Sequence, residues 1–422
     1  MKKVSRLICL GIMLWIGRIA VAQQNTILSD RIKTLMVRVG DDLKASPIIR
    51  QGENEYVEIS FDELSHDYRR LAYKVEHCEA NWQVSDQLIE SDFLDGFGDD
   101  LLIPSVEQSM NTTVLYTHYA FRIPNAEVTL RLSGNYRVTI YDKDDDEATP
   151  LAYAYFSLAE QQAIPAMTVS TNTDVDWNNQ HQQVSMSVNF SKVNNVNNPA
   201  RQFKICVLQN NRWDSAVNPA ATSVLPSSLL WQHCPELVFP AGNEYRKVEM
   251  LDVNVPTMGV DHIRRINPYY HFFLYTDTPR RNYVYDEDQD GAYVIRSTGS
   301  NVSSESDYIM VHFQLKMPEQ KDGRIVIDGR WRSRDTDPDA YIMRYDAVTQ
   351  SYVANLLMKQ GYYNYMYLFE PNNGGEHGAL SAGPVEGNYY QTENKYTAYV
   401  YFREPGGRTD RLLGFADVYY RP

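Results

Sequence analysis

Acidic side chains recur at alternate positions in the run Asp286-Glu287-Asp288-Gln289-Asp290-Gly291. Carboxylates at this spacing, with glycine sixth, resemble the start of a calcium-binding loop, which also needs a bidentate glutamate at position twelve. Position twelve here is Ser297, which offers a single hydroxyl oxygen. We therefore expect a solvated acidic turn between two strands, and we predict no metal site.

A histidine and a cysteine are adjacent at His77 and Cys78, and an imidazole beside a thiol can activate it as a nucleophile. Neighbouring side chains of a strand point to opposite faces of the sheet, so these two groups should not meet. We expect Cys78 and Trp82 to pack inside the protein and His77 to lie at its surface. His118 is expected to be an ordinary strand residue.

Motifs that mark an active site are missing from the sequence. The nine histidines form neither an H-E-x-x-H pair nor a spaced cluster, and neither a G-x-S-x-G nor a G-x-x-x-x-G-K-[ST] motif occurs. The sequence thus gives no positive reason to expect an enzyme. It predicts no cofactor and no small-molecule substrate.

The chain is acidic, with a formal net charge of -14 at pH 7. Such a chain binds nucleic acid and anionic lipid poorly, so neither is an expected partner. The acidic run from Asp142 to Glu147 is interpreted as a charged hairpin tip that keeps a sheet edge soluble.

The elements that position these side chains are strands, because apolar residues alternate with polar ones along much of the chain. The clearest segments are Tyr56–Phe61, Tyr136–Tyr141, Gln183–Phe190, Phe203–Leu208, His271–Tyr275, Tyr308–Leu315, Arg324–Ile327, Tyr396–Phe402 and Leu412–Tyr420. Helical spacing is found only in a short stretch near Ser223–Leu230. The pattern predicts an all-β protein of tandem, immunoglobulin-like β-sandwiches with mostly antiparallel strands.

The length of 422 residues predicts several domains. Polar, linker-like segments near residues 163 and 302 divide the chain into an N-terminal β-sandwich domain (23–162), a middle β domain (163–302) and a C-terminal β domain (303–422). Residues 1–22 have the basic start, short apolar run and small-residue end of a cleaved signal peptide. No later segment suggests a membrane-spanning helix, so we expect export without insertion into the membrane.

Three cysteines follow the predicted leader: Cys78, Cys206 and Cys234. So few thiols in an exported chain mean that hydrophobic cores must hold the domains together. Cys206 and Cys234 have the option of pairing, which would stabilise the fold by roughly 3 kcal/mol. Cys78 is expected to be a buried free thiol.

An aromatic strip, Lys359-Gln360-Gly361-Tyr362-Tyr363-Asn364-Tyr365-Met366-Tyr367-Leu368-Phe369, is the most unusual segment. In a strand its two faces would both be apolar or amphipathic, and only one face can be used for the core of a single sandwich. The other face must be covered by another domain, by a partner or by nothing, and tyrosine suits the case of a protein partner because its ring is buried while its hydroxyl stays at a wet rim. A sugar platform is a further possible role, since aromatic rings also stack on carbohydrate. Tyr362, Tyr363, Tyr365, Tyr367 and Phe369 are therefore candidate partner-binding residues.

Seven segments in this order resemble the type IX secretion system plug protein family: Ile59–Leu64, His77–Trp82, Tyr116–Tyr119, Leu132–Tyr136, Asp286–Gly291, Lys359–Tyr365 and Glu386–Asn394. The resemblance covers nearly the whole chain after the leader. It implies a non-enzymatic, β-rich protein of the periplasm. Such a protein docks on the periplasmic face of a very large outer-membrane β-barrel translocon and closes its opening between transport events.

The alternative function is a periplasmic or surface glycan-binding β-sandwich module that would use the same tyrosines as a stacking platform. The two functions differ in what they require. A glycan platform needs rings exposed on the isolated protein, whereas a plug should co-purify with the barrel.

Overall fold

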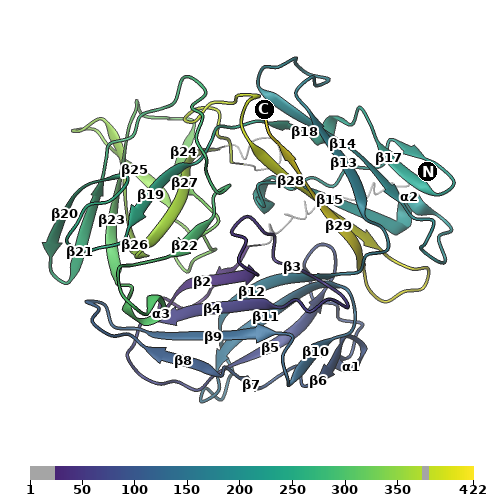
Figure 1. The fold of residues 1–422 in the computed structure, drawn as a ribbon, viewed down its shortest axis with the longest axis horizontal. Coiled ribbons are helices and arrows are strands. Elements are labelled where there is room, and N and C mark those ends of the chain that lie inside the picture. The colour runs from purple at the N-terminus through teal and green to yellow at the C-terminus, as the bar shows by residue number, and fades with distance from the viewer. Residues whose placement is uncertain (1–23, 373–379) are drawn as a thin grey trace, which may run out of the picture.

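The fold consists of three β-rich lobes that meet at a common centre (Figure 1). The structure is a computed structural model that describes residues 24–372 and 380–422, so the predicted signal peptide (1–22) lies outside the described residues. Lobe 1 comprises residues 24–162, lobe 2 residues 163–241 and 394–422, and lobe 3 the described residues of 242–393. The predicted all-β architecture of tandem sandwiches is confirmed.

Lobe 1 is a sandwich of two sheets. The first has the order β1-β12-β11-β5-β7 with β3 beside β12, and its strands are β1 (Thr26–Ile27), β3 (Ile48–Arg50), β5 (Leu71–Cys78), β7 (Leu101–Leu102), β11 (Gly134–Asp142) and β12 (Pro150–Ala159). The second has the order β2-β4-β9-β8, with β2 (Ile32–Val39), β4 (Val57–Glu63), β8 (Ser105–Gln108) and β9 (Thr117–Ile123). Helix α1 (Glu90–Phe93) and the pair β6 (Leu94–Gly96) and β10 (Val128–Leu130) close one end.

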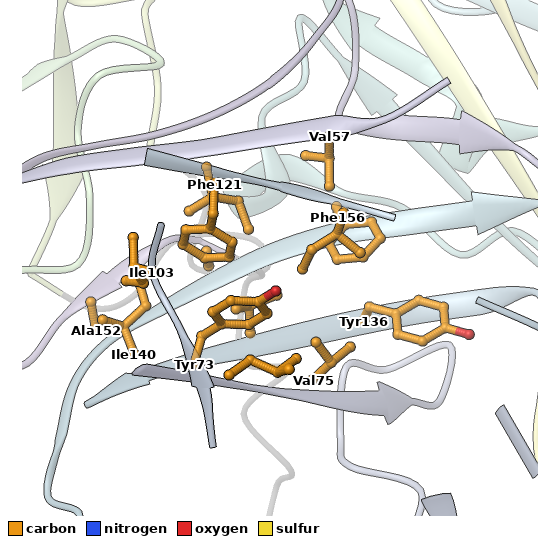
Figure 2. Close-up of a cluster of buried hydrophobic side chains, with 14 of the residues drawn as sticks. Val57, Tyr73, Val75, Ile103, Phe121, Tyr136, Ile140, Ala152 and Phe156 are labelled. Carbon is orange, nitrogen blue, oxygen red and sulfur yellow. The ribbon is translucent and has the colours of Figure 1, made fainter. Parts of the chain in front are cut away.

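The core of lobe 1 lies between these two sheets (Figure 2). Val57 and Phe121 come from one sheet and Tyr73, Val75 and Phe156 from the other, and the Tyr73 and Phe121 rings stack with centroids 4.2 Å apart. The alternation that predicted these strands places every second side chain in this layer.

Lobe 2 is a sandwich assembled from two distant parts of the chain. One sheet holds β13 (Pro165–Ser170), β14 (His181–Asn189), β16 (Ser223–Val224), β17 (Ser228–Trp231) and β18 (Val238–Pro240). The other has the order β15-β28-β29, with β15 (Phe203–Gln209), β28 (Asn394–Phe402) and β29 (Arg411–Tyr420). Short helices α2 (Pro199–Gln202), η1 (Trp213–Ser215) and η2 (Pro235–Leu237) lie in the connections. The C-terminal strands thus complete a lobe that begins some 230 residues earlier in the chain.

Lobe 3 is built on a nine-stranded sheet of order β19-β27-β24-β25-β26-β23-β21-β20, with β22 beside β27. Its strands are β19 (Arg246–Met250), β20 (Val260–Ile266), β21 (Tyr269–Leu274), β22 (Tyr293–Ile295), β23 (Tyr308–Lys316), β24 (Gly323–Asp328), β25 (Ile342–Asp346), β26 (Ser351–Lys359) and β27 (Gly361–Pro371), and helix α3 (Val302–Glu305) precedes β23. Side chains from both ends of this sheet share one hydrophobic core, as the edge-to-face contact of Phe313 with Tyr365 shows.

Two expectations differ from the structure. The division near residue 302 falls inside lobe 3, since β22 and β23 on either side of it belong to one sheet, whereas the division near residue 163 coincides with the connection from β12 to β13. The stretch Ser223–Leu230 forms a hairpin of β16 and β17 in place of the short helix, because its polar and proline-containing middle residues make a turn.

Candidate functional site

The aromatic strip forms β27, in the interior of lobe 3. Tyr363, Tyr365 and Tyr367 are all buried in its main core. The hydroxyls of Tyr365 and Tyr367 both donate to Asp277, at 2.9 and 2.8 Å, and that of Tyr363 donates to the backbone carbonyl of Lys359 at 2.6 Å. A surface role for these three rings does not fit their burial, because no ring face is left for a partner.

The second face of β27 is also covered within the chain. Met366 and Leu368 pack against Tyr245, Leu380 and Ala382 in a separate small cluster. Segments of lobe 3 itself therefore cover this second face.

The two remaining candidate residues of the strip, Tyr362 and Phe369, are half-buried. A partner contact at these two positions stays a prediction.

The adjacent pair His77 and Cys78 points to opposite faces of β5, as expected, but His77 is buried and does not lie at the surface. Its Nε2 donates to the Ser133 carbonyl at 3.1 Å, and its Nδ1 lies 3.0 Å from the Ser85 hydroxyl. Burial lowers the pKa of His77 and raises that of Cys78 to about 12. The imidazole is therefore a neutral structural group, and the thiol is unreactive.

Cys206 and Cys234 are free thiols in separate clusters of lobe 2. The optional disulfide between them is not formed. Burial raises the pKa of Cys206 to about 12 and that of Cys234 to about 11.

The two acidic runs have different fates. Asp142 to Glu147 form the turn of the β11–β12 hairpin, as predicted. In the run from Asp286, by contrast, Asp288 and Asp290 are buried at the centre of the molecule, where the expectation was a solvated turn. Lys44 of lobe 1 reaches Asp290 with its ammonium at 3.2 Å. Asp290 can be buried because the Lys44 ammonium of another lobe lies beside it and partly offsets the free-energy cost of burying the carboxylate.

Two buried carboxyls near this centre have strongly shifted acidities. Burial raises the pKa of Asp288 to about 7, assisted by the nearby charge of Asp290. Burial also raises the pKa of Glu244 to about 7, although its Oε1 accepts hydrogen bonds from the Tyr283 hydroxyl at 2.8 Å and from the backbone N–H of Glu393 at 3.0 Å. Perturbed acids of this kind mark functional candidates, yet both are buried here: Glu244 lies in the connection from lobe 2 to lobe 3, and Asp288 lies in the packed loop between β21 and β22.

A buried ion pair locks lobe 1 to lobe 3. The Lys359 ammonium at the end of β26 donates to the carboxylate of Asp62 in β4 at 2.7 Å. The Tyr308 hydroxyl donates to the same oxygen at 2.7 Å, and His118 bonds to the other oxygen at 2.7 Å. A second link is Asp307, whose carboxylate accepts the backbone N–H groups of Thr113 and Val114.

Charged pairs also join lobe 1 to lobe 2. Arg403 bonds to Glu79, and Arg411 bonds to Glu160 at 2.6 Å through one nitrogen and 2.9 Å through another. Lys395 of β28 donates to the backbone carbonyl of Lys44 at 2.7 Å. Lys44 therefore belongs to a loop that touches all three lobes, and the lobes form a body with polar locks at each junction.

A cavity of about 380 Å³ lies where the three lobes meet. Arg38, Arg212 and Arg330 line it from lobes 1, 2 and 3, and Asp214 and Asp328 are among the opposing acids. Arg330 donates to two backbone carbonyls of the Lys44 loop, and Arg212 of lobe 2 donates to the Leu380 carbonyl of lobe 3 at 3.1 Å. Arg212 and Arg330 therefore help to hold the lobes together.

Within residues 24–372 and 380–422, no group of three or more histidine, cysteine, aspartate or glutamate side chains is placed to hold a metal ion. Over the same residues no helix has the length and apolar character needed to cross a membrane.

Exposed aromatic side chains occur where the sequence analysis did not place a site. Trp177, between β13 and β14, is 75% exposed, and Tyr285, between β21 and β22, is 70% exposed. A signal was available in the sequence, since Trp177 is an isolated tryptophan in a run of Asp, Asn and Gln. A core strand would surround such a residue with apolar neighbours.

The comparisons with known proteins agree with this organisation. Residues 32–160, which fall within lobe 1, match the family model of the type 9 secretion system plug protein first domain. No curated protein matches the chain. The crystal structure of a hypothetical protein from Parabacteroides merdae ATCC 43184 is 38% identical, with a TM-score of 0.89 over 94% of this chain and 99% of that chain. The chain therefore belongs to the type 9 secretion system plug protein family.

Proposed function

We propose that this protein is a non-enzymatic plug of the periplasm that docks on the periplasmic opening of the outer-membrane type IX translocon barrel and seals it between transport events. The observation that carries the proposal, together with the family, is the Asp62–Lys359 ion pair buried between two lobes. A seal over a wide opening must keep its shape under load. Interlobe locks of this kind supply that rigidity.

The chemistry of the described residues supports a binding role. The perturbed acids Glu244 and Asp288 are enclosed in interlobe packing, and the three described thiols are buried with raised pKa values. Groups enclosed in this way have no access to a substrate.

The contact with the barrel should be large and partly polar. Specific complexes of stable proteins bury about 1,200–2,000 Å² in total. The acidic net charge of -14 favours a basic or mixed rim on the partner, because like charges opposite each other are costly. Release follows if the cargo-loaded translocon binds the plug less well than the empty one does.

An affinity pull-down tests the function. The tagged protein without residues 1–22 is incubated with detergent-solubilised outer membranes of its own bacterium, and the retained proteins are identified by mass spectrometry. Recovery of a very large outer-membrane barrel in about equal amount to the bait is the expected result. Recovery of no barrel, together with retention of the bait on a polysaccharide column, would favour the glycan-binding alternative and overturn the proposal.

A further inference from the structure

We infer that an aromatic rim at the junction of lobes 2 and 3, made of Trp177, Tyr283, Tyr285, Tyr389 and Tyr390, is the surface by which this protein docks on an apolar pocket of its protein partner. The inference rests on the proposed function, since it names the surface that a plug would use.

The members of the rim come from three loops that are tied to one another. The backbone N–H of Tyr390 donates to the carbonyl of Asn179 at 3.0 Å, which places it two residues from Trp177. Tyr389, the residue before Tyr390, has its ring centroid 6.4 Å from that of Tyr283. Tyr283 is in turn two residues from Tyr285. These contacts connect the loops around residues 177, 390 and 285 across two lobes.

The Trp177 loop is held rigid before any partner arrives. The backbone N–H of Asn178 donates to the carbonyl of Thr171 at 2.9 Å. The carbonyl of Asp176 accepts from the backbone N–H of Thr173, and the backbone N–H of Asp176 donates to the Thr173 hydroxyl, both at 2.9 Å. The Asp176 carboxylate also bonds to His181 at 2.7 Å. A large aromatic ring on a pre-organised loop loses little conformational entropy when it binds, which is the property of interface anchors.

The second loop is long for a connection within a sheet. Residues 275–292 join β21 to β22 without a strand or helix of their own. Connections of this length in a compact domain are uncommon, and they are usually either functional loops or disordered linkers. This one is fixed at its base, where Asn243 donates to the carbonyl of Asn282 and Arg280 donates its backbone N–H to Val385. Its apolar tip residues Val284 and Tyr285 are exposed.

The charges beside the rim indicate the kind of partner. Asp174 and Asp176 precede Trp177, and Glu287 is exposed two residues after Tyr285, whereas Asp286 is paired with Lys247 and Arg281 is exposed two residues before Tyr283. Carboxylates at this margin repel the anionic headgroups of a lipid surface. Together with Arg281 they complement a protein pocket that is apolar at its centre and has charges of both signs at its edge, with lysine or arginine opposite the carboxylates, since interfaces anchored by tryptophan and tyrosine commonly have a polar rim.

The experiment compares Trp177→Ser and Tyr285→Ser with the unchanged protein in the pull-down from solubilised outer membranes. The matched control is Val348→Ser, which removes a 92% exposed apolar side chain from the turn between β25 and β26. Thermal melts show that each variant is folded. We expect each rim variant to retain at least tenfold less barrel than the unchanged protein, and the control to retain as much as the unchanged protein does.

The outcomes separate the surface from the function. If the unchanged protein and both rim variants retain the barrel equally, the rim is not the docking surface, while the plug function stands. If the unchanged protein retains no barrel, the plug function fails and the inference fails with it. If the protein binds a polysaccharide and this binding requires Trp177, the rim is a sugar platform, and the inference that it docks on a protein pocket is wrong.

Discussion

The Lys359 ammonium donates a hydrogen bond to the Asp62 carboxylate at 2.7 Å although the two residues belong to different lobes, and both side chains are 1% exposed. Burial alone would raise the pKa of Asp62, but the charge of Lys359 and the hydrogen bond from His118 hold it below its ordinary value. The pair exists only while lobes 1 and 3 are docked. Its removal therefore reports on how firmly they are joined.

We predict that Lys359→Met lowers the free energy of unfolding by about 3–5 kcal/mol at pH 7, because it leaves the buried Asp62 carboxylate without its cation. Urea unfolding followed by circular dichroism measures this loss. The double variant Asp62→Leu with Lys359→Met should recover much of it, since no unpaired charge then remains. Because the native pKa of Asp62 is lowered, the stability that this carboxylate gives the fold depends on pH. The contribution is present above pH 4 and is lost as the pH falls through the lowered native pKa of Asp62.

The matched control for this pair is Arg324→Met. Arg324 bonds to Glu370 at 2.8 Å, but its side chain is 49% exposed, so its loss should cost less than about 1 kcal/mol. Equal effects of Lys359→Met and Arg324→Met would show that the buried pair does not lock the lobes.

A second prediction concerns Glu244, whose pKa burial raises to about 7. A carboxyl with a raised native pKa stabilises the fold below its unfolded value near 4.5, and this contribution is lost as the pH rises through 7. Glu244→Gln should therefore be as stable as the unchanged protein at pH 4.5. At pH 8 it should be more stable by about 3 kcal/mol at most, because the amide never has to ionise. Thermal melts at the two pH values measure the difference, and a constant offset between them would contradict the assigned cause.

Local patterns predicted most strands but not which strands pair. Tyr308–Leu315 and Tyr396–Phe402 were found from their alternation or apolar character, and both are strands. One of the two partners of β28 is β15, nearly 200 residues earlier, and no feature of either segment encodes that distance. The sequence consequently predicts a division near residue 302, which lies inside lobe 3. A search for long polar linkers misses an insertion within a domain, because the connections at 241–245 and near 393 are short and packed in the structure.

The candidate site was predictable only in part, for a related reason. The sequence showed that both faces of Tyr362–Phe369 are apolar or amphipathic, and most of these residues are buried in β27. It could not show that Tyr245 and Leu380 of the same lobe supply the second cover, since this depends on tertiary packing. The sequence neighbours indicate which aromatic residues are internal. Apolar residues surround those of the aromatic strip, which is internal, whereas polar residues surround Trp177, which is exposed.

The third prediction tests the location of the strip. Tyr367→Ala should destabilise the protein by about 3–5 kcal/mol, because it removes a fully buried ring and leaves Asp277 with one fewer donor. Tyr362→Ala, at a half-buried position of the same strand, should cost clearly less. The triple replacement of Tyr363, Tyr365 and Tyr367 by Ser should prevent folding. A folded triple variant that loses the barrel in a pull-down would restore these rings as partner-binding residues.

The fourth prediction concerns the three described cysteines. Burial raises the pKa of Cys78 and Cys206 to about 12, so neither thiol forms an attacking thiolate at pH 8. The folded protein should react with a chromogenic disulfide reagent at least a hundredfold more slowly than the chain unfolded in guanidinium does. Because Cys206 and Cys234 are unpaired, a reductant should leave the melting temperature unchanged. Cys206→Ala supplies the control, since it removes a buried thiol without opening a disulfide. A melting temperature that falls in reductant for the unchanged protein, but not for Cys206→Ala, would show that the bond between Cys206 and Cys234 forms after all.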